Sequence, residues 1–447
     1  MTAINPQNVP DAAIAAEAET APDLTAAAVD VIPPEIVAQS LGEYLRAWLA
    51  RVRGGDAGLL PVLVALVAVT IVFTAVSPRH VFLSAGNLVN LFDQSAVFIV
   101  LAMGEGFVLL LGEIDLSIGY VAAIGGIVTA QLVQPNFNWP WPAAMAAGLL
   151  ACAGIGFIQG TIITRLGIPA FVVTLAGYLF WFGVMIIILG PAGQVGITSA
   201  LVPGQVALYG IVYAYIAPTI AWLGLAVILL TLANILWRRD SGRRRSGLVA
   251  PPVGLTIAKI VLAAIAGIAV VFICNLNRGV ILPVVGVPWV VPLLLITLVL
   301  WTVLLERTQF GRHMYAVGGN PEASRRAGIN VSRVRTMAFV LCSMTAGLAG
   351  IIYTSQLGGV TTNIAGGSLV LYAVAAAVIG GTSLFGGRGR VIHGLLGGLV
   401  IGAIYNGLYL LGLPIQYQLI VTGLVLLAAV SVDSLSRRNR GGALVKG

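Results

Sequence analysis

Long apolar runs dominate this sequence and most constrain what it can fold into. Two examples are 143–163 and 168–190, each close to the roughly 20 apolar residues that cross a bilayer as a helix. Only 9% of all residues are charged, against roughly 25% in soluble domains. We therefore predict an all-α polytopic membrane protein. The composition argues against a soluble enzyme, a disordered protein and a nucleic-acid binder, and the unbroken runs argue against a β-barrel.

The apolar runs predict about twelve transmembrane helices, with ten to fourteen as the accepted range. The tenth run is short, which is typical of a broken or re-entrant piece. The sixth is long and contains Pro218, which favours a kink or a split. The predicted spans are 58–76, 94–111, 116–133, 143–163, 168–190, 210–237, 257–275, 284–305, 336–355, 367–380, 391–411 and 415–433.

The basic residues predict the orientation of these spans. If the N-terminus is cytoplasmic, the outer loops contain only Arg79 and Arg278 of the 24 Lys and Arg residues. Basic residues concentrate in cytoplasmic loops of membrane proteins, so this alternation fits the positive-inside rule. Trp139 and Trp141 in an outer loop suit the membrane interface. Both termini are therefore predicted to be cytoplasmic.

The ends of the chain differ from the apolar body. Residues 1–34 lack Lys and Arg and hold several acidic residues among alanines, which predicts a disordered acidic tail. Residues 35–57 include an amphipathic stretch, and we expect an interfacial helix there. The transmembrane domain is then 58–433, followed by a basic cytoplasmic tail at 434–447.

The segment 306–335 predicts a short helix in a cytoplasmic loop. Asn320 suits an N-cap, Pro321 the first turn, and Glu322 the positive end of the helix dipole. Gly328 suits the C-terminal cap, so the helix covers about 321–327. Such a rigid helix is a surface on which a partner can act. The alternative interpretation is an ordinary basic loop.

Polar side chains inside the apolar runs are candidate pathway residues, because they are costly in hydrocarbon. Glu105 is the first candidate, either facing the translocation pathway or serving as a buried structural hydrogen-bonding group. The other pathway candidates are Asn90, Asp93 and Gln94 at the outer mouth, Tyr405 and Asn406 in the eleventh span, and Gln416 and Gln418 in the twelfth.

The sequence GEIDLSIG, at 112–119, contains candidates for a helix cap or a gate. Asp115 with Ser117 can cap the following helix, and Glu113 lies beside them. GGTSLFGG, at 380–387, shares three positions with it, so the two loops are candidate equivalents in a duplicated fold. Two glycine-spaced faces, Gly394–Gly398–Gly402 and Gly156–Gly160, predict close packing within the chain or between subunits.

The sequence lacks the common motifs for nucleotide binding and for hydrolytic catalysis. It has no GxxxxGK[ST] phosphate-binding loop, no HExxH and no nucleophile elbow. Cys152, Cys274 and Cys342 lie in or at the ends of apolar runs and read as small core residues. We expect no metal and no cofactor in this chain. Uphill transport would then need a separate ATPase or an ion gradient.

Three motifs carry a family resemblance. GRHMYAVGGNPEASRRAGINV, at 311–331, closely resembles the signature loop of sugar permeases of ATP-binding-cassette importers, and the loops at 112–119 and 380–389 are similar to GGIDLSVG and GGTSLxGGxG of that family. Glu113 departs from the commoner glycine. The extra length between about 200 and 290 resembles the xylose-type branch.

The resemblance implies a permease subunit for a sugar, with a pentose such as xylose favoured, that works by alternating access. It implies a second permease copy, an ATPase with two nucleotide-binding domains that binds the ATP, and an extracytoplasmic sugar-binding protein, in a bacterial inner membrane. The ATPase-docking residues would be Asn320, Pro321, Glu322, Ala323, Arg325, Arg326 and Gly328. The alternative is an ion-coupled secondary transporter that uses Glu105.

Overall fold

The computed structural model describes residues 40–53, 58–248, 250–279, 282–362, 364, 366–414, 416–424 and 427. The predicted acidic tail at 1–34 and basic tail at 434–447 lie outside these residues. The chain divides into two compact units. The main unit holds Ala57–Leu225 and Gly267–Gly447, and the smaller unit holds Met1–Asp56 and Ala226–Ala266.

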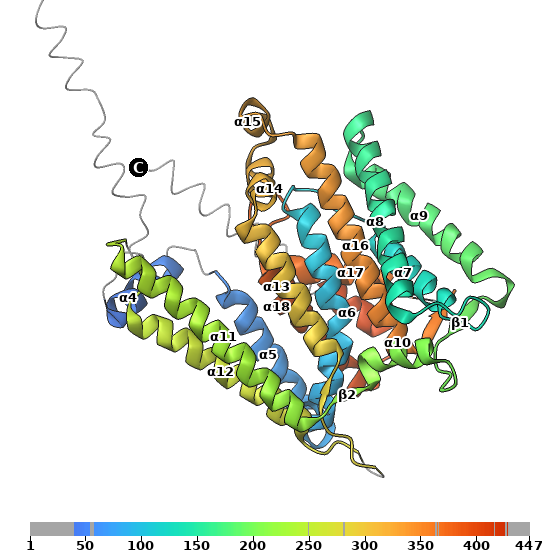
Figure 1. Ribbon diagram of the computed structural model, residues 1–447, viewed down its shortest axis with the longest axis horizontal. Helices are drawn as coiled ribbons and strands as arrows, with labels where there is room; N and C mark the ends of the chain where they lie inside the picture. Colours follow the sequence, from blue (N-terminus) through green and yellow to red (C-terminus); the bar gives the residue numbers. More distant parts are fainter. Residues whose placement is uncertain are drawn as a thin grey trace, which may run out of the picture. The chain divides into compact units, whose positions relative to one another are not determined.

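Helices make up nearly all the secondary structure of the described residues (Figure 1). They are α4 (Leu41–Arg53), α5 (Leu60–Val76), α6 (Ala85–Leu109), α7 (Ile118–Leu132), α8 (Trp141–Leu166), α9 (Ala170–Leu189), α10 (Pro203–Tyr213), α11 (Pro218–Arg245), α12 (Val253–Asn275), α13 (Val290–Arg307), α14 (Gln309–Gly319), α15 (Pro321–Arg326), α16 (Val331–Leu357), α17 (Gly366–Gly380) and α18 (Val391–Leu410). Two 3₁₀ turns, Pro78–Leu83 and Gly190–Ala192, and a helical stretch at 416–424 complete the set.

The predicted helical membrane protein is confirmed in its main features. Every predicted span contains a helix, and eight of the described helices are long and apolar enough to cross a membrane. The shorter apolar helices α5, α7 and α17 account for three more predicted spans. The twelfth, 415–433, is described only in part. The number of crossings and the side of the termini stay predictions.

The sixth predicted span is split, as Pro218 allowed. Helix α10 ends at Tyr213 and α11 begins at Pro218, and strand β2 (Tyr215–Ile216) lies between them. Proline lacks a backbone N–H and disfavours helix in the residue before it, so it suits the start of a helix rather than its interior. Strand β2 pairs antiparallel with β3 (Val287–Pro288). The only other sheet in the described residues joins β1 (Gln194–Gly196) to β4 (Gly359–Thr361).

Several helices begin or end a few residues away from the predicted bounds, and two departures concern polar or basic stretches of the sequence. Helix α6 begins at Ala85, nine residues before the predicted start at 94, and Ser84 caps it by accepting a hydrogen bond from the Asn87 N–H (3.3 Å). The polar residues at the start of α6 predicted a loop, but other parts of the protein cover some of them. Helix α14 occupies a stretch expected to be loop. It buries Gly311, Met314 and Val317 at helical spacing, a pattern typical of an amphipathic helix.

Close helix packing forms the core of the main unit. Helix α16 packs against α6, α7 and α8, and α18 packs against α6 and α17. Both predicted glycine faces lie at these contacts, inside the chain. A Cβ on Gly398 would come within 2.5 Å of the Ile99 Cα, and one on Gly160 within 2.8 Å of the Thr336 Cα. Glycines at these places let the backbones approach closely.

Candidate functional site

The three motifs of the sequence meet at one end of the main unit. The Gly387 N–H donates a hydrogen bond to the Leu110 carbonyl (2.9 Å), which joins the third motif to the end of α6. The Tyr315 hydroxyl of α14 donates to the Gly389 carbonyl (2.8 Å). A Cβ on Gly112 would lie 3.3 Å from the Phe385 carbonyl oxygen. The loops 112–119 and 380–387 therefore lie side by side, with α14 against them.

Helix α15 forms as its residues predict. The Asn320 side chain accepts a hydrogen bond from the Ala323 N–H (2.9 Å), Pro321 occupies the first turn, and Gly328 has the left-handed backbone (φ 83°) expected past a helix end. The observed helix, Pro321–Arg326, is one residue shorter than predicted. Asn330 then caps α16 by accepting from the Arg333 N–H (2.9 Å).

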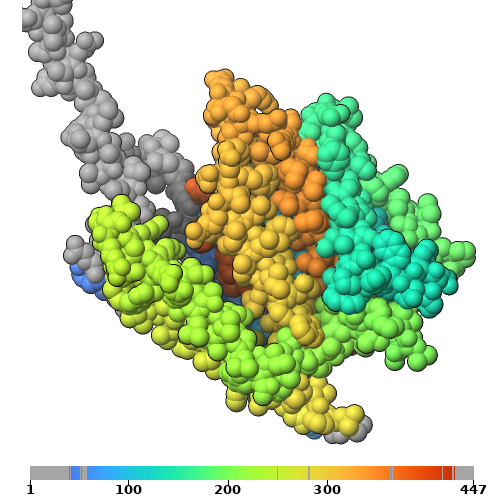
Figure 2. Space-filling model, viewed as in Figure 1, coloured from blue at the N-terminus to red at the C-terminus, as the bar shows by residue number. Residues whose placement is uncertain are grey.

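The side chains of α15 are largely exposed. Glu322 pairs with Arg325 (2.8 Å) and with Arg326 (3.4 Å), and all three side chains are more than half exposed. Only Ser324 of this helix is buried. In Figures 1 and 2, α15 lies at the tip of the gold and orange helices of the main unit. Exposed ion pairs of this kind add little stability. These side chains can therefore bind a partner protein instead at little cost to the fold.

Hydrogen bonds join α13 and α14, the two helices before α15, to the third motif and the residue after it. Arg390, the residue before α18, donates two hydrogen bonds to Glu306 Oε1 at the end of α13 (2.7 and 2.9 Å). Burial and the neighbouring Glu306 raise the pKa of the Tyr315 hydroxyl, and Arg390 opposes that rise. The pair of Arg390 with Glu306 thus joins the end of α13 to the start of α18.

The first motif is tied to α16 by an ion pair. Glu113 pairs with Arg335, one turn into α16, and both side chains are mostly buried. Burial raises the pKa of the Glu113 carboxyl and the Arg335 charge opposes that rise. The other carboxylate oxygen of Glu113 is buried without a hydrogen-bond partner. Because α15 leads through a short turn into α16, this pair links α15 to the loop between α6 and α7.

Two fully buried carboxyl groups lie behind that ion pair. Glu105 Oε1 accepts a hydrogen bond from the Asp115 N–H (3.1 Å), and the Cys342 thiol lies 3.9 Å from an oxygen of each acid. Asp115 Oδ1 accepts from the Ser117 N–H (2.9 Å) and hydroxyl (2.6 Å). The Ser117 contacts form the turn before α7, and the N-cap residue of α7 is Ser117, which makes no side-chain capping hydrogen bond. Burial raises the pKa of the Asp115 carboxyl, and these hydrogen bonds oppose that rise.

The network continues into α8. Gln159 donates from Nε2 to the Ser117 hydroxyl oxygen (2.8 Å), while its own Oε1 is buried without a partner. Sequence reasoning missed Gln159 and treated Cys342 as a small core residue. The signal for Gln159 was a lone amide in an apolar run, of the same kind as Glu105. The contact of Cys342 with two acids depends on the tertiary fold, so the sequence alone did not indicate it.

The remaining pathway candidates fall into separate places. Asn406 donates to Gln94 Oε1 (3.1 Å) and accepts from Asn87 (2.9 Å), so these amides join α6 to α18. Asp93 is buried with one oxygen unpartnered, and Asn90 is exposed. Asn90, Asp93 and Gln94 lie within α6, because that helix begins earlier than predicted, and their place at the outer mouth stays a prediction.

Tyr405 lies in a cluster of aromatic side chains, where its ring centroid is 5.5 Å from that of Phe98 and 6.2 Å from that of Tyr372. The cluster joins α6, α17 and α18. In the last helical stretch, Gln418 is buried and donates to the Leu413 carbonyl (3.0 Å), whereas Gln416 is exposed. The polar candidates therefore do not converge on one site within this chain.

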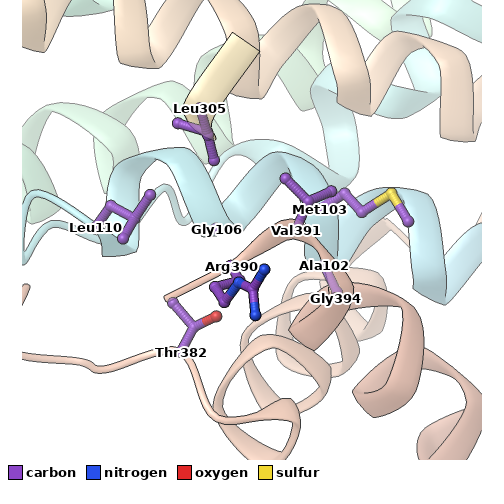
Figure 3. A pocket seen from close by; sticks show the side chains of 9 residues that line it. All are labelled: Ala102, Met103, Gly106, Leu110, Leu305, Thr382, Arg390, Val391 and Gly394. Atoms are coloured by element: carbon purple, nitrogen blue, oxygen red, sulfur yellow. The ribbon is translucent and has the colours of Figure 1, made fainter. Parts of the chain in front are cut away.

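A small pocket opens between α6, α13 and α18 (Figure 3). Thr382 and Arg390 are its polar lining residues, and Arg390 is already paired with Glu306. A polyhydroxylated solute needs several hydrogen-bonding partners, so this lining does not suit one. Among the described residues, no group of three or more His, Cys, Asp or Glu side chains is placed to hold a metal ion.

Comparison with known proteins identifies the family. Residues 87–430 match the family described as "branched-chain amino acid transport system / permease component". The chain belongs to this permease family. The permease is 34% identical to the xylose transport system permease protein XylH of Escherichia coli (strain K12), over 84% of this chain and 91% of that protein.

Two further relatives of the permease come from the same organism. The D-allose transport system permease protein AlsC is 30% identical over 83% of this chain and 90% of its own length. The ribose import permease protein RbsC is 31% identical over 88% and 96%. No solved structure matches the permease. The predicted resemblance is confirmed, and the chain is a multi-pass membrane permease rather than an enzyme.

Proposed function

We propose that this permease is the membrane subunit of an ATP-driven sugar importer, with a pentose such as xylose as the favoured solute. The observation that carries the proposal is the similarity, over more than four fifths of the chain, to permeases named for xylose, allose and ribose. Two of these three sugars are pentoses, and the xylose permease matches at the highest identity of the three. The membrane would be the inner membrane of a bacterium.

The proposed energy source is ATP bound and hydrolysed by a partner subunit, because this sequence has no phosphate-binding loop of its own. The docking surface would be α15, whose exposed Glu322, Arg325 and Arg326 stand on a capped helix. A movement of α15 would reach the helical bundle in two ways. One is through the contacts of α14 with the third motif, and the other is through those of α16 with the first. Alternating access would follow when the ATPase moves α15.

The proposed assembly contains a second copy of this chain, an ATPase with two nucleotide-binding domains and an extracytoplasmic sugar-binding protein. The candidate pathway residues lie at separate places in one chain, which supports a pathway completed by the second copy. Solute affinity would then reside largely in the binding protein, and the pathway itself need not hold a tight sugar site.

The test is affinity purification of the tagged chain from its native membrane in mild detergent, followed by mass spectrometry. An ATPase with two nucleotide-binding domains should accompany the wild type. Glu322→Ala and the double variant Arg325→Ala/Arg326→Ala should lose it while keeping the wild-type melting temperature. Arg333→Ala, another exposed arginine close by in the chain, is the matched control and should retain the ATPase.

Retention of the ATPase by the α15 variants would overturn the docking assignment. A wild-type chain that reproducibly carries no ATPase would overturn ATP coupling as well. Ion coupling would then be the favoured mechanism, because Glu105 and Asp115 form a fully buried carboxyl pair of the kind that proton-coupled transporters use.

A further inference from the structure

The junction between α11 and α12 carries an unusual concentration of arginine. Five arginines and one aspartate fall within 238–245, at the end of a helix otherwise apolar from Pro218 onward. All of these residues belong to the smaller unit. Neither the three motifs nor the proposed transport function accounts for this cluster, which we name the arginine tip (Arg238, Arg239, Arg243, Arg244 and Arg245).

Two of the five arginines build the tip itself. Asp240 is fully buried and accepts from Arg239 Nε at Oδ1 (2.9 Å) and from the Thr256 hydroxyl at Oδ2 (2.8 Å). Arg244 donates to the Pro251 carbonyl (2.8 Å) and to the Thr256 hydroxyl oxygen (3.3 Å). These bonds tie the end of α11 to the start of α12 and fix the backbone that presents the other arginines.

The other three arginines, Arg238, Arg243 and Arg245, are exposed, and their side chains have no ion-pair or hydrogen-bond partner among the described residues. Arg238 and Arg245 are seven residues apart, so two helical turns place them on the same face. Asp240, two residues after Arg238, points to the opposite side, toward Thr256. The structure thus separates arginines that hold the tip together from arginines that face outward.

The surface next to the tip is that of a lipid-exposed helix. Only 6% of the most apolar window of α11 is buried within the protein. Val227, Leu230 and Ile235 are each more than half exposed, and Trp237, immediately before the arginines, is 48% exposed. Tryptophan beside a basic cluster at the end of an apolar helix marks the level of the lipid headgroups. This pattern is typical of arginines at the level of the lipid phosphates.

We propose that the arginine tip binds the phosphate headgroup of an anionic phospholipid, with Arg238 and Arg245 as the principal contacts. A guanidinium can donate two parallel hydrogen bonds to a phosphate. The exposed apolar side chains of α11 are in place to receive the acyl chains of the same lipid. A soluble anion or the acidic stretch 1–34 of this chain could satisfy the charge, but neither would use that apolar surface.

The experiment measures lipid binding to the purified, delipidated full chain by native mass spectrometry. Phosphatidylglycerol is titrated against phosphatidylcholine, with inorganic phosphate as a third arm. The test variant is R238Q/R245Q, and R165Q/R307Q is the matched control. Arg165 and Arg307 are also exposed at helix ends, and their side chains have no ion-pair or hydrogen-bond partner among the described residues. Melting temperatures check that each variant folds.

The wild type should bind phosphatidylglycerol in preference to phosphatidylcholine. One arginine near an anionic surface contributes about fivefold in affinity, so R238Q/R245Q should bind phosphatidylglycerol roughly 30-fold more weakly. The control should stay within about twofold of the wild type, since its arginines lie elsewhere. Equal binding by R238Q/R245Q and wild type would overturn the proposal, as would equal affinity for the two lipids.

Two further outcomes would also overturn it. If inorganic phosphate displaces phosphatidylglycerol at equal concentration, the tip is a site for soluble anions rather than for lipid. If the full chain binds no phosphatidylglycerol but a variant lacking residues 1–34 does, the acidic stretch is the occupant. Unchanged binding on removal of 1–34 supports the lipid.

Discussion

At the scale of single residues, glycines decide how closely the helices approach. Helix α8 offers a matched pair: a Cβ on Gly156 would clash with the Phe339 carbonyl of α16, whereas a Cβ on Gly154 would meet nothing within 4 Å. We predict that Gly156→Ala lowers stability by about 1–3 kcal/mol, as overpacked cores do. Gly154→Ala should be neutral or slightly stabilising, because alanine favours helix. Thermal unfolding in detergent compares them, and equal melting temperatures would contradict the close packing.

Glu105 supports a second prediction at this scale. Gln at position 105 keeps an oxygen for the Asp115 N–H and removes one of two neighbouring acids, so E105Q should fold with wild-type stability. E105A leaves that buried N–H without its partner and opens a cavity, which should cost about 2–4 kcal/mol. A stable E105Q protein that still transports would assign Glu105 a structural role. A stable E105Q that no longer transports would assign it to the pathway or to ion coupling.

The sequence revealed single residues unevenly. Glu105 stood out because charged groups are costly in apolar runs, and Asp115 and Ser117 stood out as a candidate helix cap or gate. The structure places all three in one buried network. Asn320 and Asn330 followed from capping rules, which act over a few residues. Another contact of Glu105, Cys342, lies 237 residues away and depends on packing that a single sequence does not display.

At the scale of elements, the ion pair between Glu113 and Arg335 joins the first motif to α16. Removing either partner leaves a mostly buried charge uncompensated, so E113Q and R335Q should each lose roughly 1–3 kcal/mol of stability. The reversed pair E113R/R335E should recover part of that loss. The rate of uptake by the assembled importer should rank these variants in the same order as their stability, because the pair links α15 to the loop at 112–119.

Melting temperatures of the wild type, the two single variants and the reversed pair test this interaction. A reversed pair that is no more stable than the less stable single variant would show that the two charges do not interact. Stability restored without uptake would instead mean that the pair holds the fold and does not transmit the movement of α15.

Elements were predictable where local signals agreed. Every predicted span contains a helix, and the break at Pro218 was foreseen from backbone sterics. The start of α6 was wrong because its polar first turns lie against other parts of the protein. The amphipathic α14 was missed because its apolar residues are few and embedded in a basic segment. In both cases tertiary contacts outweighed the local pattern.

At the scale of the whole molecule, the source of energy distinguishes the two proposed mechanisms. The complete importer, reconstituted in vesicles with ATP held constant at the ATPase, should take up sugar at the same rate with and without a protonophore. The physical reason is that the proton gradient supplies no work to an ATP-driven cycle. Radiolabelled xylose uptake measures this, and collapse of uptake under the protonophore would support ion coupling through Glu105.

The burial of α6 has a consequence for how the chain is made. Of the eight helices long enough to span a membrane, α6 has the lowest mean hydropathy, and 78% of its most apolar window is covered by other parts of the protein. Much of that cover comes from α16, α17 and α18. The first of these begins at Val331, more than two hundred residues after α6 ends at Leu109.

A ribosome that adds 5–20 residues per second needs on the order of 10–40 s to make that stretch. During this interval the amides and acids of α6 must stay in the insertion machinery or face lipid unshielded. Most of the cover of α6 is therefore completed only when segments made much later have been added.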